Sequence, residues 1–248
     1  MNYLFIVPCY NESKRWNRAY WEEMVSIIDT FWVFVDDGST DNTQNLINGL
    51  KLSNTKLIKM SKNCGKSEAI RMGVVWSYKN LFPEFESIGY VDSDGAINKN
   101  DIEHFNKVFA EKYKVDDYIS LWASRVALSG REINRKLARH ILGRVVSLIV
   151  SARRSYIAYD TQCGLKYFAF NNKTAALFEK SFKTRWFVDI EIFIRYTLVN
   201  QKRMKIWEEP LMYWDEIPGS KINFKQTWVV LKELVYIKFM QKKIRKVS

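Results

Sequence analysis

Residues 31–41 read FWVFVDDGSTD: a run of apolar residues, two acids, a turn and a helix start. The apolar run predicts a buried strand. Gly38 permits a tight turn after it, and the polar residues at 39–41 can cap the next helix. A capped turn does not account for Asp36 and Asp37, two adjacent acids at the end of a buried strand. We expect one of them to contact a ligand or to stay unpaired, because a buried charge without a partner is costly.

The same alternation of strands and helices continues on both sides of this stretch. The predicted strands are Tyr3–Val7, Phe31–Val35, Lys56–Met60 and Ile88–Val91, and the predicted helices are Trp16–Asp29, one from near Asp41, and Ser67–Leu81. This order is typical of βαβ units and predicts a parallel sheet, in which ligands bind beyond the carboxyl ends of the strands. Four polar loops fall there: Pro8–Glu12, Asp36–Ser39, Asn63–Lys66 and Asp92–Asp94.

The second half is less regular. Its predicted strands are Ile119–Ala123, Gly164–Phe170 and Met204–Trp207, and its predicted helices are Arg135–Ala152, Phe187–Leu198 and Gln226–Lys243. There is no repeat, low-complexity tract or linker rich in Pro, Gly and Ser. We therefore predict one α/β domain with a mostly parallel central sheet flanked by helices.

The composition favours a folded protein with an anionic partner. The 248 residues are 47% hydrophobic and 15% aromatic, which excludes global disorder, and the net charge is +12. Residues 121–154 and 221–248 each hold eight basic residues against one acid. A nucleotide, a nucleic acid or a membrane surface could meet such charge. Because the basic blocks flank an acidic centre, we expect no nucleic-acid partner.

Cysteines and apolar runs bear on the compartment. The three cysteines are widely spaced and form no CxxC, which argues against a disulfide scaffold or a structural zinc site and for a reducing compartment. The longest apolar run, Val145–Ala152, is far shorter than the roughly 20 residues of a spanning helix. The opening residues do not read as a signal peptide. We therefore predict no crossing of a membrane.

Two motifs carry chemistry. Asp92 and Asp94 flank Ser93 just past a predicted strand, where two carboxylates can hold a hard divalent ion such as Mg²⁺ or Mn²⁺ and leave room for phosphate oxygens. The loop ending in Lys66 opens a helix, so backbone N–H groups and the ammonium suit a diphosphate, although a simple helix start is an alternative. Arg71, one turn on, is either a surface charge or a second nucleotide contact.

Together these loops resemble the family-2 glycosyltransferases, which have the glycosyltransferase A fold. The matching strings are IVPCYNES (6–13), VDDGSTDNT (35–43), NCGKSEAIRMG (63–73) and YVDSDGA (90–96). Four further strings look like the dolichyl-phosphate β-glucosyltransferase branch and its bacterial polyprenyl-phosphate relatives: SR (124–125), DTQCGLKYF (160–168), RWFVDIEIFI (185–194) and EEPLMYWDEIPGSK (208–221). The resemblance runs from residue 6 to about 240. It departs at Ser67, where the commoner loop reads GKG.

The resemblance implies a role for each matched residue. By this resemblance, the nucleotide pocket contains Pro8, Tyr10 and Glu12, and the base, which is uracil, meets Asp36 or Asp37 with Arg71 nearby. The diphosphate lies beside Gly65 and Lys66. The metal and the donor sugar lie at Asp92, Ser93 and Asp94. Around the reacting sugar and acceptor, the matched residues are Asp189 and Glu191 as the acidic pair, Gln162 and Trp186 in the acceptor-lining segments, and Ser220 and Lys221 in a loop that closes over the donor.

The resemblance implies an inverting, metal-dependent transfer of glucose or a related hexose from a UDP-sugar to a polyprenyl or dolichyl phosphate. A phosphate acceptor arrives largely as a dianion and needs cationic orientation, for which Arg125 and Arg131 are the candidates. The alternative is a carbohydrate hydroxyl acceptor, as in surface-polysaccharide synthesis, which requires Asp189 as general base.

The expected organisation has two parts. Residues 1–221 form the catalytic domain, with a nucleotide-sugar half at 1–96 and an acceptor half at 97–221, and residues 222–248 form a basic amphipathic helix. Apolar residues recur at mostly helical spacing in that helix, namely Trp228, Leu231, Leu234, Val235, Phe239 and Met240. We expect the helix to lie on an anionic membrane surface, at the cytoplasmic face. The alternative is that the same stripe packs against the sheet.

Overall fold

A computed structural model of the chain describes residues 1–50, 52–116, 120–134, 158–215, 217 and 224–244. The strands of its main sheet are β1 (Tyr3–Cys9), β2 (Thr30–Asp36), β3 (Thr55–Lys59), β4 (Ser87–Val91), β5 (Ser120–Ser124), β7 (Leu165–Ala169) and β8 (Ile206–Pro210). Two short strands, β6 (Glu132–Asn134) and β9 (Tyr213–Asp215), pair separately. The helices are α1 (Arg18–Val25), α2 (Thr43–Asn48), α3 (Lys66–Leu81), α4 (Lys99–Asp116), α6 (Asn172–Phe178), α7 (Val188–Asn200) and α8 (Phe224–Ile244).

The main sheet is mostly parallel, as predicted. Its strand order is β3-β2-β1-β4-β7-β5-β8, and β7 is the strand that runs antiparallel to both of its neighbours. Strands β1, β2, β3, β4, β5 and β8 therefore end at one edge, and β7 begins there, with Val91 opposite Leu165. This edge collects the loops that follow six strands and the loop that precedes a seventh.

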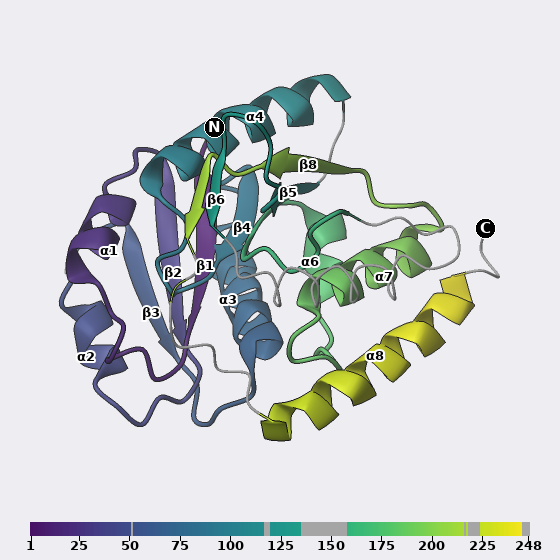
Figure 1. Ribbon diagram of the computed structural model, residues 1–248, viewed down its shortest axis with the longest axis horizontal. Coiled ribbons are helices and arrows are strands. Elements are labelled where there is room, and N and C mark those ends of the chain that lie inside the picture. The colour runs from purple at the N-terminus through teal and green to yellow at the C-terminus, as the bar shows by residue number, and fades with distance from the viewer. Residues whose placement is uncertain (51, 117–119, 135–157, 216, 218–223, 245–248) are drawn as a thin grey trace.

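Helices cover both faces of the sheet, so the strands are buried on both sides and read as continuous apolar runs (Figure 1). Alternate residues of β1 serve the two layers: Leu4 and Ile6 join the core under α3, α6, α7 and α8, while Phe5 and Val7 join the core under α1, α2 and α4. At Gly73 in α3 an added Cβ would lie 2.5 Å from Ile6 Cγ2, so glycine allows this helix to approach β1 closely.

Some elements of the structure were not predicted from the sequence. Helix α4 is one of them, although Ile102, Phe105 and Phe109 have helical spacing and are buried. Helix α6 and the β6–β9 pair are the others. The predicted helix Trp16–Asp29 is shorter at both ends, because Asn17 caps α1 and Asp29 has a left-handed backbone, with φ 58°. Strand β8 lies at Ile206–Pro210, later than the predicted Met204–Trp207, and the predicted helix Arg135–Ala152 lies outside the described residues.

Within the described ranges, no helix combines the length and hydropathy that are needed to cross a bilayer.

Candidate active site

The two acids that follow β2 are both hydrogen-bonded within the protein. Asp36 accepts from the Ser39 N–H (3.2 Å) and the Gln44 side chain (2.6 Å). Asp37 accepts from the backbone N–H groups of Cys64 and Gly65, each at 2.7 Å, and from the Asn63 side chain. Neither acid is therefore unpaired, and the contact of Asp36 or Asp37 with the base of a nucleotide remains a prediction. Asp37 ties the loop after β2 to the loop before α3.

The loop after β1 is held in the same way. Asn11 has a left-handed backbone, with φ 48°, and its side-chain oxygen accepts from the Thr40 N–H at 2.9 Å. Glu12 is 1% exposed and forms an ion pair with Arg15. Pro8 and Tyr10 are half-buried beside it. These contacts give Glu12 a structural role, and its contact with a nucleotide remains a prediction.

Lys66 and Asp92 form the centre of the site. The Lys66 ammonium lies 2.5 Å from Asp92 Oδ1 and 5.6 Å from the centre of the Tyr90 ring. Gly164 crosses directly behind Asp92, whose N–H donates to the Gly164 carbonyl at 3.0 Å, and a Cβ at Gly164 would collide with the Asp92 carboxylate. The packing of β7 against β4 therefore requires glycine at this position.

Asp94 and Asp189 complete an acidic cluster around Lys66. Burial, followed by the charge of Asp92, raises the pKa of Asp94. Asp189 lies in the first turn of α7 and is 3% exposed; burial raises its pKa to about 7, against the opposing effect of Lys66. Its Oδ1 has no hydrogen-bond partner among the described residues. A buried carboxylate with a pKa near neutrality can accept a proton or stabilise positive charge on a substrate.

Glu191, the other member of the predicted acidic pair, serves the fold instead. Its carboxylate accepts from the N–H groups of Lys183 and Thr184 and from the Thr184 hydroxyl, and it forms an ion pair with Arg195 at 2.8 Å. Both oxygens are engaged, and the side chain is 2% exposed. Glu191 therefore orders the loop before α7, and a catalytic role for it remains a prediction.

Arg125 is also committed to a protein partner. Its guanidinium forms two hydrogen bonds with Asp160, at 2.7 and 2.8 Å, and faces the Trp214 ring at 5.2 Å. Burial opposes the charge, but Asp160 raises the pKa of Arg125 above its usual value. Arg125 therefore anchors the loop that begins at Asp160. Arg131 differs, because its Nη1 is buried with no hydrogen-bond partner among the described residues.

Other buried polar atoms also lack partners within the described part of the chain. Three of them belong to residues at the end of β5 and in the loop before β7: Ser124 Oγ, Thr161 Oγ1 and Gln162 Nε2. Gln162 was predicted to line the acceptor site, whereas Ser124 and Thr161 were missed. Their signal was present in the strings SR and DTQCGLKYF, which contain them. Unpaired buried polar groups at a strand-end edge are typical of a ligand site.

The other predicted residues are placed as follows. Ser93 is buried within the Asp92–Asp94 loop, and Gly65 is the N-cap residue of α3, with φ 98°. Arg71 forms an ion pair with Glu68 and donates to carbonyls at the end of α6, so it joins two helices, and its contact with a nucleotide stays a prediction. Trp186 donates its N–H to Glu233 of α8. Ser220 and Lys221 lie outside the described residues.

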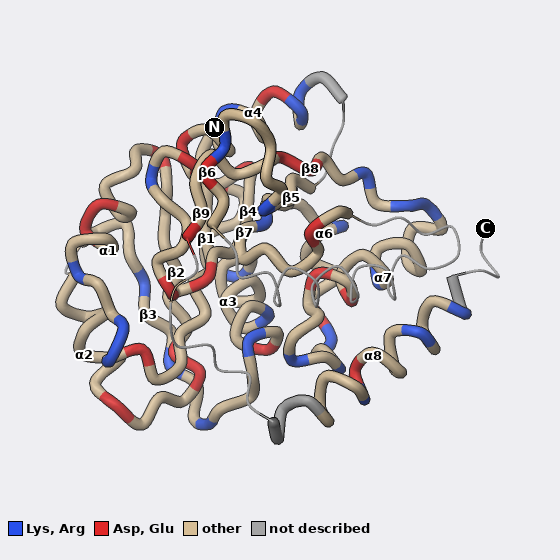
Figure 2. The backbone as a smooth tube through the Cα atoms, viewed as in Figure 1, with Lys and Arg blue, Asp and Glu red and all other residues tan. Residues whose placement is uncertain are grey.

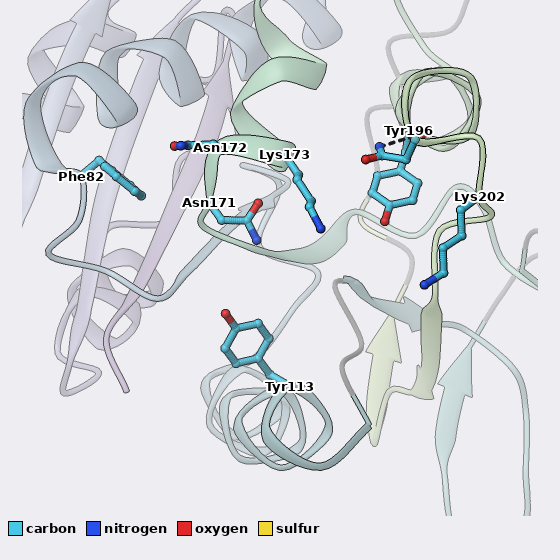
Figure 3. A pocket seen from close by; sticks show the side chains of 8 residues that line it. Phe82, Tyr113, Asn171, Asn172, Lys173, Tyr196 and Lys202 are labelled. Carbon is cyan, nitrogen blue, oxygen red and sulfur yellow. Dashed lines mark hydrogen bonds between the residues drawn. The ribbon is translucent and has the colours of Figure 1, made fainter.

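A cavity of about 510 Å³ lies elsewhere (Figure 3). Phe82, Asn171 and Lys173 line part of it, at the end where β7 finishes and β4 begins. Tyr196 of α7 and Tyr113 of α4 point into it from two other elements. None of the predicted site residues lines this cavity, so the candidate site is the cluster at the opposite edge of the sheet.

The chain is similar to known glycosyltransferases over most of its length. The model of glycosyl transferase family 2 matches residues 4–175. A dolichyl-phosphate beta-glucosyltransferase of Trichomonas vaginalis is 30% identical over 245 residues, covering 94% of this chain and 69% of the relative. The Saccharomyces cerevisiae protein of that name is 28% identical over 256 residues, covering 94% and 73%. An uncharacterised protein of Methanocaldococcus jannaschii is 27% identical and covers 95% and 99%.

Among solved structures, the glucosyl-3-phosphoglycerate synthase of Mycobacterium tuberculosis in complex with Mn²⁺, UDP and glucosyl-3-phosphoglycerate superposes with a TM-score of 0.65. It is 11% identical, and the match covers 95% of this chain and 78% of that one, so it bears on the fold alone. The fold is of the glycosyltransferase A type, as predicted. Because the family model spans most of the chain, this protein belongs to glycosyl transferase family 2 and is a glycosyltransferase.

Proposed function

We propose that this glycosyltransferase moves a hexose, such as glucose, from a UDP-sugar to a polyprenyl or dolichyl phosphate, with inversion at the anomeric carbon. The observation that carries the proposal is the cluster at the sheet edge, where Lys66 lies among Asp92, Asp94 and Asp189. The relatives named dolichyl-phosphate beta-glucosyltransferase support the sugar and the acceptor class. The UDP-bound structural neighbour supports the donor.

The residues of the cluster fit a divalent cation held together with a diphosphate. Among the described residues no three acidic, His or Cys side chains gather as a metal site, so a cation would rest on Asp92 and Asp94 and take its remaining ligands from the donor. Burial and then the charge of Asp92 raise the pKa of Asp94, and a cation would relieve the repulsion between these two carboxylates. Bound there, Mg²⁺ or Mn²⁺ would neutralise charge on the leaving diphosphate.

Lys66 has a complementary role in this proposal. In the structure its ammonium balances Asp92, and the charges of Asp92 and Asp189 raise the pKa of Lys66 although burial opposes it. A lysine that stays charged at the start of a helix binds phosphate as a point charge, assisted by the backbone N–H groups of that helix end. We assign Lys66 to the donor diphosphate.

Acceptor binding is assigned to Arg131, whose buried Nη1 is unpartnered within the described residues. A phosphate monoester is largely a dianion at neutral pH and needs an orienting cation more than a base. The second candidate function is transfer to a carbohydrate hydroxyl. One observation favours it: burial raises the pKa of Asp189 to about 7, which suits a general base.

Arg131→Ala is expected to raise the KM for polyprenyl phosphate about tenfold or more, because a hydrogen bond to a charged group is lost. The affinity for UDP should stay unchanged. The measurement is transfer of labelled glucose from UDP-glucose to polyprenyl phosphate, with an oligosaccharide as the competing acceptor and Arg18→Ala, an exposed arginine, as the control. Transfer to the oligosaccharide alone would favour the second function. Arg125→Ala is unsuitable, because it removes the positive charge that neutralises the buried Asp160 carboxylate.

We further propose that α8 lies on an anionic membrane surface, at the cytoplasmic face. The helix has two apolar faces. Ile237 is buried, and Leu234 and Met240 pack against the core. The prediction that Leu234 and Met240 belong to a membrane-facing stripe is therefore wrong. The outer apolar side chains are Trp228 (67% exposed), Leu231 (49%), Val235 (70%) and Phe239 (57%). Basic residues recur along the same helix (Figure 2).

Vesicle flotation tests this surface. Wild-type protein should float with vesicles that contain anionic lipid, and binding should fall with salt, since each basic residue near the surface contributes about 1 kcal/mol. The double substitution Trp228→Ser and Phe239→Ser should weaken binding at least about tenfold through loss of apolar burial. Ile28→Ser, which removes an apolar side chain that is 83% exposed before β2, is the matched control. Equal binding by all three proteins would contradict the proposal.

A further inference from the structure

Helix α8 reaches the active-site edge through one carboxylate. Glu233 is 5% exposed, and its two oxygens accept the backbone N–H groups of Arg185 at 2.7 Å and Trp186 at 3.1 Å. A buried carboxylate that accepts two N–H groups holds that backbone firmly, because losing either bond leaves a desolvated polar group. Glu233 therefore holds the segment that leads into α7.

Arg185 in turn contacts the loop that precedes α3. Its guanidinium donates to Asn63 Oδ1 at 2.5 Å, and its carbonyl accepts from the Ser67 N–H at 3.4 Å. The side chain lies over Gly65 so closely that an added Cβ would be 2.6 Å from its Nε. Asp37 holds the same loop from the other side. Residues 63–65 are thus clamped between Asp37, which follows β2, and Arg185, which α8 positions through Glu233.

We propose that Glu233 is a positioning residue for the donor site: through Arg185 it holds residues 63–65 in the conformation that presents Lys66 to the donor. Helix α8, which carries the exposed apolar face, thereby keeps residues 63–65 ordered, so displacing α8 loosens these residues. The part of this inference that concerns the donor rests on the proposed function, whereas the clamp itself does not.

The chain contains its own reporter for the clamp. Cys64 lies within the clamped loop and is half-buried, whereas Cys9 and Cys163 are each 1% exposed. With Glu233→Gln, the rate at which a thiol reagent labels Cys64 in the native protein should rise about tenfold, the factor expected for losing a charged hydrogen bond. Glu233→Asp should give a smaller rise, and Glu22→Gln, an exposed acid on α1, none. An unchanged Cys64 rate in Glu233→Gln, or equal acceleration at all three cysteines, would overturn the inference.

Calorimetric titration with UDP tests the consequence for the donor. Glu233→Gln and Arg185→Ala should each weaken UDP binding about tenfold, and the double variant should bind no more weakly than either. Additive losses would mean that the two residues act separately and would refute the relay. If wild-type protein binds no UDP, the proposed donor fails, while Cys64 labelling still decides whether the clamp exists.

Discussion

Asp94→Asn should reduce sugar transfer by about 10³-fold or more while the protein still folds, because one of two hard oxygen ligands is lost where the leaving diphosphate gains charge. Folding should survive for an electrostatic reason. Burial and the charge of Asp92 raise the pKa of Asp94, so the folded protein already disfavours this negative charge. A neutral amide relieves that repulsion and keeps the acceptor oxygen that receives the Ala96 N–H.

The measurements are transfer rate, thermal unfolding and calorimetric titration with Mn²⁺ in the presence of UDP. Asp29→Asn is the matched control, since it makes the same change at an exposed residue that precedes β2, and asparagine tolerates its left-handed backbone. Wild-type transfer should stop in EDTA and return with Mn²⁺ or Mg²⁺. Full activity of Asp94→Asn, or of wild-type protein in EDTA, would refute the metal assignment.

Asp189→Asn is expected to lower transfer by about 10²- to 10³-fold and at the same time to stabilise the protein above neutral pH. Positive charge develops on the sugar ring as the diphosphate leaves, and an ionised carboxylate beside the ring stabilises it. The carboxylate must be ionised for this role, so wild-type activity should rise with pH through about 7, the raised pKa of Asp189. The variant should lack that step in its pH profile.

The ionised Asp189 carboxylate, which favours sugar transfer, lowers the stability of the folded protein. Burial raises the pKa of Asp189 from 3.8 to about 7, so the folded state holds this proton more tightly than the unfolded state does. The contribution to stability is complete below about pH 4 and is lost as the pH rises to about 7; at its largest it amounts to about 4 kcal/mol. Denaturant unfolding at pH 5 and pH 8 should show wild-type protein losing more stability than Asp189→Asn between the two. Equal losses would contradict the assignment of the raised pKa to Asp189.

Local patterns in the sequence were enough to predict the parallel part of the sheet and the position of the acidic motif at its edge. Apolar runs such as Phe31–Val35, followed by a turn residue and a helix cap, are local signals, and the chain direction then sets where each loop lies. The antiparallel placement of β7 between β4 and β5 depends on pairing between distant segments, which has no local signal. The helical spacing of the apolar residues in α4 is also a local signal, so this helix could have been predicted from the sequence.

Which charged residues remain available to a ligand depends on tertiary packing, which local patterns do not show. From the sequence, Asp37, Arg125 and Glu191 are as plausible as Asp189, because residue type and motif do not state a partner. Packing brings Asp37 to the backbone of Cys64 and Gly65, Arg125 to Asp160 and Glu191 to Arg195. It leaves Asp189 Oδ1 without a partner among the described residues. The physical reason is that a buried charge is stabilised by groups that surround it in space, and those groups come from segments far away along the chain.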